Sequence, residues 1–281
     1  MAASERIVGR GIGNKVILAS VVLVAIVWML PIAWVLILSF KPNSELMIST
    51  ASAFHPPYTL KNYTDIFQTS GVFRWLWNSA VVSVGVTVGI LILSSLAGYG
   101  FARAEFKGRD VIFILVLLGL AVPEQAVIIA RHQIFSDLKM HNTYPAIILP
   151  GLSSAFGVFL MTQYFKAIPK DIDEAAMLDN ASRFKIFWKV LLPLTIPAQA
   201  TLGIFSFLGA WNDYLWPLIS ATKPEMFTIT VGIASTQTNF AQSEGLGFLM
   251  AQAIFAGLPV FVVYLFFQKY IVRAVAGAAI T

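Results

Sequence analysis

Residues 16–40 read VILASVVLVAIVWMLPIAWVLILSF, an apolar run of 25 residues with no charged side chain. Crossing a hydrocarbon core about 30 Å thick takes roughly 20 apolar residues in a helix. The run is therefore long enough to cross a membrane. A cleavable signal peptide would have an apolar region of only about 7 to 15 residues. We therefore predict that this segment is a retained transmembrane helix.

Five further stretches have the length and apolar character of membrane spans, namely residues 80–101, 111–130, 146–165, 196–218 and 246–267. Charged side chains occur in two of them, as Glu124 and Asp213. Backbone polar groups cannot stay unpaired in lipid, and the period-2 alternation of barrel strands is absent. We therefore predict an all-α integral membrane protein with six transmembrane helices, forming a single domain over residues 1–281.

The composition excludes several classes of protein. The chain is 58% hydrophobic and 12% charged, whereas a soluble domain carries about 25% charged residues. The net charge is +5, but Lys and Arg lie between the apolar stretches and form no patch for nucleic acid. The absence of cysteine excludes disulfides and thiolate metal sites. His55, His132 and His141 lack metal-ligand spacing, so we expect no metal site.

The basic residues predict the orientation of the chain. Six spans place both termini on one side of the membrane, and 13 of the 19 Lys and Arg residues fall on that side. Because basic loops remain in the cytoplasm, we predict that both termini are cytoplasmic. The 13 residues are Arg6, Arg10, Lys15, Arg103, Lys107, Arg109, Lys166, Lys170, Arg183, Lys185, Lys189, Lys269 and Arg273.

Two connections are too long to be simple turns. Residues 41–79, on the outer side, predict an extracytoplasmic lobe able to meet another protein. Residues 166–195, on the cytoplasmic side, predict two short helices separated by a turn. Asp171 lies three residues before Glu174, the spacing of a capping box, and EAAML at residues 174–178 favours a helix. Asn180 tolerates the left-handed conformation that ends a helix, and Ser182 can cap the next one.

The second of these helices has an apolar face. Phe184, Phe187, Trp188 and Leu191 recur at i, i+3, i+4 and i+7. Such a helix could lie in the membrane interface, fold back on its own bundle or dock into a groove of a partner protein. The pattern alone leaves these three possibilities open.

The loop resembles the signature of binding-protein-dependent ABC importer permeases, which is E-A-A, three residues, G, nine residues, I-x-L-P. Residues 174–176 match its start, and Leu192-Pro193 match its end. Asn180 occupies the glycine position and Val190 the isoleucine position. Every spacing is kept. We name residues 166–195 the coupling loop.

Other stretches resemble the carbohydrate-uptake branch of this family, which contains the smaller permease of the maltose transporter. They are SFKP at residues 39–42, YGFAR at 99–103, AWND at 210–213 and WPL at 216–218. The resemblance implies the type I ABC importer permease fold in the bacterial inner membrane. It also implies import of a sugar, oligosaccharide or sugar derivative.

The resemblance further implies the partners of the chain. A second permease subunit would complete a heterodimeric pathway, two copies of a cytoplasmic ATPase would use ATP and Mg, and an extracytoplasmic binding protein would deliver the solute. The chain itself would bind no cofactor and would not be an enzyme. By analogy, the coupling loop would fit a groove on the ATPase and transmit its closure, through Glu174, Ala175, Ala176, Met177, Asp179, Asn180, Ser182 and Phe184.

The charged positions within the spans are candidates for the substrate pathway or a gate. A charge at membrane depth costs roughly 2.5 to 3.5 kcal/mol on insertion scales and normally marks a pathway. The alternative is gating or subunit packing at a wetted outer end, because polar and aromatic groups are common there. The candidates are Trp211, Asn212, Asp213 and Tyr214 in the fifth span, and Glu124 and Gln125 at an expected break in the third, beside Pro123.

Two further hypotheses remain open. An importer permease for a non-carbohydrate solute would carry the same loop signature. A secondary transporter would use mid-membrane carboxylates, and only Asp213 could serve that role. A membrane-embedded enzyme is disfavoured because the spans show no paired carboxylates, histidine pair or activated nucleophile.

Overall fold

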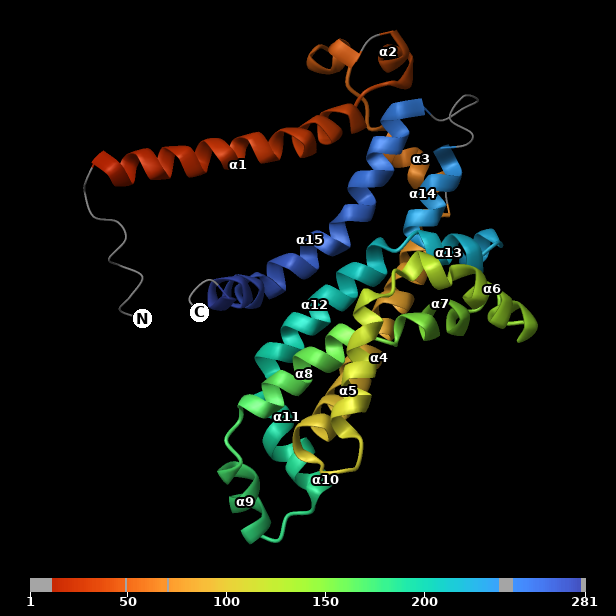
Figure 1. The fold of residues 1–281 in the computed structure, drawn as a ribbon. Coiled ribbons are helices and arrows are strands. Elements are labelled where there is room, and N and C mark those ends of the chain that lie inside the picture. The colour runs from red at the N-terminus through yellow and green to blue at the C-terminus, as the bar shows by residue number, and fades with distance from the viewer. Residues whose placement is uncertain (1–11, 49, 70, 238–244, 279–281) are drawn as a thin grey trace. The chain divides into compact units, whose positions relative to one another are not determined.

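A computed structural model describes residues 12–48, 50–69, 71–237 and 245–278, and within these ranges every regular element is helical (Figure 1). The predicted all-α fold is therefore confirmed. Arg6 and Arg10, used to predict the orientation, lie outside the described residues. The longer helices are α1 (Ile12–Ser39), α4 (Val72–Arg103), α8 (Ala155–Ala167), α12 (Ile196–Asn212) and α15 (Gly245–Ala278).

Shorter elements connect the longer helices. The short α-helices are α2 (Asn43–Ile48), α3 (Lys61–Thr69), α5 (Arg109–Leu118), α6 (Ile128–Asp137), α7 (Tyr144–Gly151), α9 (Asp171–Leu178), α10 (Arg183–Ile186), α11 (Leu192–Leu194), α13 (Leu215–Ser220) and α14 (Ile229–Gln237). The 3-10 helices are η1 (Thr50–Phe54), η2 (Gly119–Ala121), η3 (Glu124–Val127) and η5 (Pro224–Met226). A π-helical turn, η4, covers Phe187–Leu191.

Among the described residues, three helices are long and apolar enough to cross a membrane, and three bent pairs bring the number of candidate spans to six. The straight candidates are Lys15–Ser39, Val72–Arg103 and Gly245–Gln268. The bent pairs are Arg109–Ala121 with Glu124–Asp137, Tyr144–Gly151 with Ala155–Ala167, and Arg183–Leu194 with Ile196–Asn212, at 96°, 49° and 76°. Half of the predicted spans are therefore interrupted.

The break in the third span lies at Val122-Pro123, as expected from the sequence. The residue before a proline is driven toward extended backbone, and Val122 has ψ 114°. Pro123 is also extended, and the helix resumes as η3 at Glu124. The chain consequently turns by 96° at this point.

The fourth and fifth spans are not the continuous helices predicted over residues 146–165 and 196–218. In the fourth, α7 ends at Gly151, and α8 starts anew with the Ser154 hydroxyl accepting the Gly157 N–H at 3.0 Å. In the fifth, α12 ends at Asn212, and Asp213 has extended backbone with ψ 131° before α13 begins. Both breaks occur where polar side chains follow an apolar run.

The chain forms two compact units, Met1–Ser70 with Thr236–Phe255 (unit 1) and Gly71–Ser235 with Ala256–Thr281 (unit 2). The predicted lobe at residues 41–79 extends too far, because α4 already begins at Val72. The first turns of α4 contain the polar residues Arg74 and Asn78. Because these residues interrupt the apolar run, hydropathy places the start of the helix too late.

Within unit 1, the SFKP stretch fastens the lobe to the end of α1. Lys41 is fully buried, and its Nζ donates to the carbonyl oxygens of His55 at 2.6 Å and Pro57 at 3.0 Å. The Asn62 amide donates to the carbonyl oxygens of Ser39 and Lys41 at 2.8 and 2.9 Å. The SFKP motif therefore stabilises unit 1 through contacts within the unit.

Unit 2 is built around α4, which packs against α7, α8 and α12. A Cβ atom on Gly98 would lie 2.7 Å from the Met161 Cβ, so only glycine permits the observed approach of α4 and α8. In Figure 1, α9 and α10 lie at one end of this bundle, and α6, α7 and α13 lie at the other. The buried core is Val82, Val86, Ile90, Ile147, Met161, Phe165, Ile186, Phe187, Leu191, Ala198, Leu202 and Ala221.

Candidate functional site

The first helix of the coupling loop is α9, and it starts one residue earlier than a capping box would require. Lys170 is the N-cap and makes no side-chain cap, while Asp171 already belongs to the helix. The predicted capping box is therefore wrong. Asp171, Asp173 and Glu174 instead place three carboxylates in the first turn, where negative charge favours the helix dipole.

The turn between the two helices has the predicted geometry. Asn180 has φ 54°, the left-handed conformation that glycine adopts most easily and asparagine tolerates. The Ser182 hydroxyl accepts the Lys185 N–H at 3.3 Å and caps α10. Both predictions are confirmed.

The predicted apolar face of the second helix is only partly covered by the bundle. After α10 the chain enters the π-helical turn η4, whose i to i+5 bonding changes the angular spacing of side chains. Phe187 and Leu191 are buried, whereas Phe184 is 70% exposed and Trp188 is 43% exposed. The Trp188 ring lies 6.1 Å from the Phe184 ring and 5.2 Å from the Phe187 ring, so it links the exposed and the buried parts of this face.

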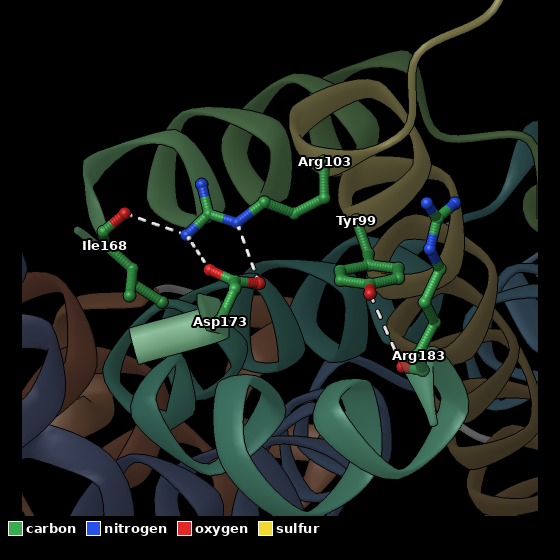
Figure 2. A network of polar contacts seen from close by, with 5 residues as sticks. All are labelled: Tyr99, Arg103, Ile168, Asp173 and Arg183. Atoms are coloured by element: carbon green, nitrogen blue, oxygen red, sulfur yellow. Dashed lines mark hydrogen bonds and ion pairs between the residues drawn. The ribbon is translucent and has the colours of Figure 1, made fainter. Parts of the chain in front are cut away.

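The inward side of the loop is held by a polar network that Figure 2 shows. The Arg103 guanidinium, at the end of α4, binds the Asp173 carboxylate with Nη2–Oδ2 at 3.0 Å and Nε–Oδ1 at 3.3 Å. Arg103 Nη2 also donates to the Ile168 carbonyl oxygen at 2.8 Å. The side chains of Arg103 and Asp173 are 8% and 10% exposed. From the sequence, Arg103 was noted only among the cytoplasmic basic residues and in the YGFAR stretch, and Asp173 was not singled out.

The outward side of the loop carries most of the predicted coupling residues. Leu178, which was not among them, is 85% exposed. Ala176 is the exception, since it is partly buried against the core. The remaining predicted residues are exposed, namely Glu174, Ala175, Met177, Asp179, Asn180, Ser182 and Phe184.

A cavity of about 410 Å³ lies at the other end of unit 2. Of the predicted pathway residues, it brings together Glu124, Asn212 and Asp213. The other three do not line it: Trp211 is buried and stacks on Phe207, and Tyr214 and Gln125 are exposed. The full lining is Val82, Val86, Ile90, Glu124, Arg131, Ile147, Gly151, Ser154, Phe156, Leu202, Phe205, Ser206, Gly209, Ala210, Asn212, Asp213 and Trp216.

Sequence reasoning missed Arg131 at this cavity. Its Nη1 donates to Glu124 Oε1 at 2.8 Å, and its guanidinium lies 5.1 Å from the centre of the Trp216 ring. The Trp216 indole N–H donates to the Ala146 carbonyl oxygen at 2.9 Å. The spacing of seven residues between Glu124 and Arg131, about two helical turns, was the available signal. In the described part of the chain, no group of three or more His, Cys, Asp or Glu side chains could bind a metal.

Residues 90–277 match the family model described as binding-protein-dependent transport system inner membrane component. The chain belongs to this family. It is thus a multi-pass permease subunit of a binding-protein-dependent importer. The matched segment includes the coupling loop and most of the cavity lining.

Individual proteins agree with this assignment. The chain is 33% identical over 252 residues to the arabinooligosaccharides transport system permease AraQ of Halalkalibacterium halodurans, covering 89% of this chain and 90% of the relative. It is 32% identical over 264 residues to the trehalose/maltose transport system permease MalG of Thermococcus litoralis, covering 92% and 94%. A crystal structure of a bacterial ABC transporter that imports the acidic polysaccharide alginate matches with a TM-score of 0.78 at 21% identity, covering 93% and 99%. The predicted type I permease fold is thereby confirmed.

Proposed function

We propose that this chain forms one half of a carbohydrate pathway and that its coupling loop docks on a cytoplasmic ATPase. A second permease subunit would complete the pathway, and ATP and Mg would be used only by two copies of the ATPase. The observation that carries the proposal is the division of the coupling loop. Glu174, Ala175 and Asn180 of its signature are exposed, while Asp173 and Phe187 fasten it inward to the bundle.

The exposed side of the loop has the chemistry of a docking surface. Leu178 and Phe184 offer large apolar side chains that are 85% and 70% exposed. Burying such side chains in a pocket is the usual source of binding energy at an interface. Glu174 lies on α9 and Asp179 lies at its C-terminal end. Both carboxylates can pair with Arg or Lys of the partner. A groove with an apolar floor and a basic rim fits this surface.

Affinity purification of the chain from native membranes in mild detergent tests the assembly. The expected result is recovery of a second permease and two copies of an ATPase per complex. Recovery of the chain alone, in a form that still transports without ATP, would contradict the proposal. It would favour the secondary transporter and return Asp213 to the centre of the mechanism.

The cavity supports a carbohydrate without a strongly acidic group as the solute. Arg131, the cationic side chain among the described lining residues, is already paired with Glu124. An anionic solute would meet two carboxyl groups, Glu124 and Asp213, and no unpaired guanidinium. Hydroxyl groups of a neutral sugar can instead bond to Asn212, Ser154 or Ser206, above apolar walls. The sugar specificity named for the relatives AraQ and MalG supports the same class.

Uptake by the co-purified importer in proteoliposomes, with its binding protein, tests the solute class. The probes are radiolabelled maltose, arabinotriose and an alginate trisaccharide. We expect ATP-dependent uptake of a neutral probe, and uptake of the acidic probe alone would contradict the proposal. An importer that takes up none of the three, but does take up an amino acid or an ion, would establish the non-carbohydrate alternative.

A further inference from the structure

We propose that α4 carries the movement of the coupling loop to the cavity, and that Arg103 is the positioning residue that fixes the loop to α4. The proposal rests on the proposed docking of the loop on an ATPase. In the sequence, α4 is not directly joined to the coupling loop. The loop joins α8 to α12, whereas α4 precedes both in the chain.

The covalent connections of the loop are poorly suited to transmit a displacement. Residues 168–170, between α8 and α9, are not helical. On the other side, α10 runs through the π-helical turn η4 and then bends by 76° where α12 begins. Interruptions of this kind are the usual places where a helix bends. By contrast, α4 is one uninterrupted helix of 32 residues.

A buried pair of opposite charges attaches α9 to α4. Arg103 and Asp173 form an ion pair at 3.0 Å and a hydrogen bond from Nε to Oδ1 at 3.3 Å, with little exposed surface. The third contact, from Arg103 to the Ile168 carbonyl oxygen, fixes the non-helical stretch before α9 as well. Removing one partner would leave the other charge buried and unpaired, a strongly unfavourable state.

A second attachment holds the other helix of the loop. Tyr99, one turn before Arg103 on α4, donates its hydroxyl to the Arg183 carbonyl oxygen at 3.4 Å. Its ring packs against the rings of Phe187 at 5.0 Å and Phe165 at 5.8 Å. Figure 2 shows Arg103 directed toward α9 and Tyr99 directed toward α10. Both halves of the loop are therefore bound to one turn of one helix.

The same helix forms a wall of the cavity. Val82, Val86 and Ile90 of α4 line it, and they share an unbroken helical backbone with Tyr99 and Arg103. A displacement of α9 would thus reach the cavity wall without crossing a break. Coupling between two sites is shown by a change at one that alters the other, so the measurement is made at the cavity after a change at Arg103.

The test uses a cysteine introduced at the cavity. The natural chain has no cysteine, so Ser206→Cys in the co-purified importer reports accessibility through its rate of labelling by a thiol reagent. The labelling rate is compared without nucleotide and with ADP and vanadate. In the otherwise natural chain we expect the rate to change with nucleotide. With Arg103→Gln or Asp173→Asn added, we expect the change to disappear, while the ATPase stays bound and hydrolyses ATP.

The double variant and a matched control complete the design. Arg103→Gln with Asp173→Asn should be no worse than either single change, because both remove one interaction. Arg109→Gln should leave the nucleotide response intact, because the Arg109–Asp110 pair has the same 3.0 Å contact but its side chains are 32% and 80% exposed. A nucleotide response that survives in Arg103→Gln would overturn the role of α4, and so would loss of the ATPase from that variant. No response in the natural chain would instead contradict the proposed function.

Discussion

At the predicted outer end of unit 2, buried polar side chains bind other parts of the same unit, whereas the coupling loop leaves large apolar side chains exposed. Asn78 is fully buried, donates to the carbonyl oxygens of Glu225 and Phe227, and accepts from the Tyr144 hydroxyl. Leu178 and Phe184, at the other end, are mostly exposed. Asn78 therefore stabilises the outer end internally, whereas the proposed docking on an ATPase would cover the exposed side of the loop. Changes at the two ends should therefore fail in different ways.

The largest expected effect is that of Glu174→Lys. It reverses the charge on the exposed side of α9 without touching the Arg103–Asp173 pair. We expect uptake to be abolished while the chain still inserts in the membrane, as judged by its amount in the membrane fraction. Glu105→Lys, an exposed change in the nearby connection after α4, is the control and should transport normally. Normal uptake by Glu174→Lys would contradict the coupling role of this surface.

Two phenylalanines of the same loop separate stability from docking. Phe187 is 2% exposed, so Phe187→Ala should lower the free energy of unfolding by about 3–5 kcal/mol. Phe184 is 70% exposed, so Phe184→Ala should leave the melting temperature in detergent unchanged. The same change should reduce the amount of ATPase that co-purifies. Equal melting temperatures for the two variants would remove the distinction between the two sides of the loop.

At the outer end, Asn78→Ala should act on stability. It removes the donor to the Phe227 carbonyl and the acceptor of the Tyr144 hydroxyl, and an unsatisfied buried group costs about 1–3 kcal/mol. The Glu225 carbonyl still accepts from Arg74 Nε at 3.2 Å. We expect a lower melting temperature with ATPase binding intact. Tyr144→Phe, which removes only one of these bonds, should have a smaller effect. If Asn78→Ala released the ATPase without destabilising the chain, the two ends would not differ as described.

The smallest expected effect concerns Asn180, which stands at the glycine position of the signature. Because its φ is 54°, Asn180→Ala should cost about 1–2 kcal/mol. Asn180→Gly should be tolerated, since glycine adopts this conformation without a steric penalty. Uptake and melting temperature of the two variants, measured together, check the prediction. A more harmful effect of glycine than of alanine would contradict the backbone explanation. An equal loss of uptake in both variants, with unchanged melting temperatures, would mean that the asparagine side chain itself binds the partner.

The sequence predicted the parts of the molecule that depend on local pattern. Hydropathy located the six apolar segments, and the signature located the loop and the left-handed residue Asn180. Hydropathy did not reveal the breaks near Gly151 and Asp213. It measures the tendency of a segment to leave water, and it does not report whether the helix is continuous. The π-helical turn at Phe187–Leu191 was also missed, since the heptad-like spacing of aromatic residues assumes a regular helix.

The contacts between distant segments lay beyond sequence reasoning. Arg103 and Asp173 are 70 residues apart, and Asn78 and Glu225 are 147 residues apart. A single sequence contains no signal that pairs such residues. Within the cavity, Glu124 and Asp213 could be singled out because a carboxylate in an apolar stretch is costly. Trp211 was grouped with them by proximity in sequence, but it points into the packing against Phe207.

A cryo-electron microscopy structure of the co-purified importer in lipid nanodiscs, with a non-hydrolysable ATP analogue, tests the central claim most directly. The account predicts that Leu178 and Phe184 are buried in a groove of the ATPase while Arg103 still binds Asp173. A structure in which the outward side of α9 faces lipid or solvent, or in which the Arg103–Asp173 pair has separated so that Asp173 contacts the partner, would contradict it.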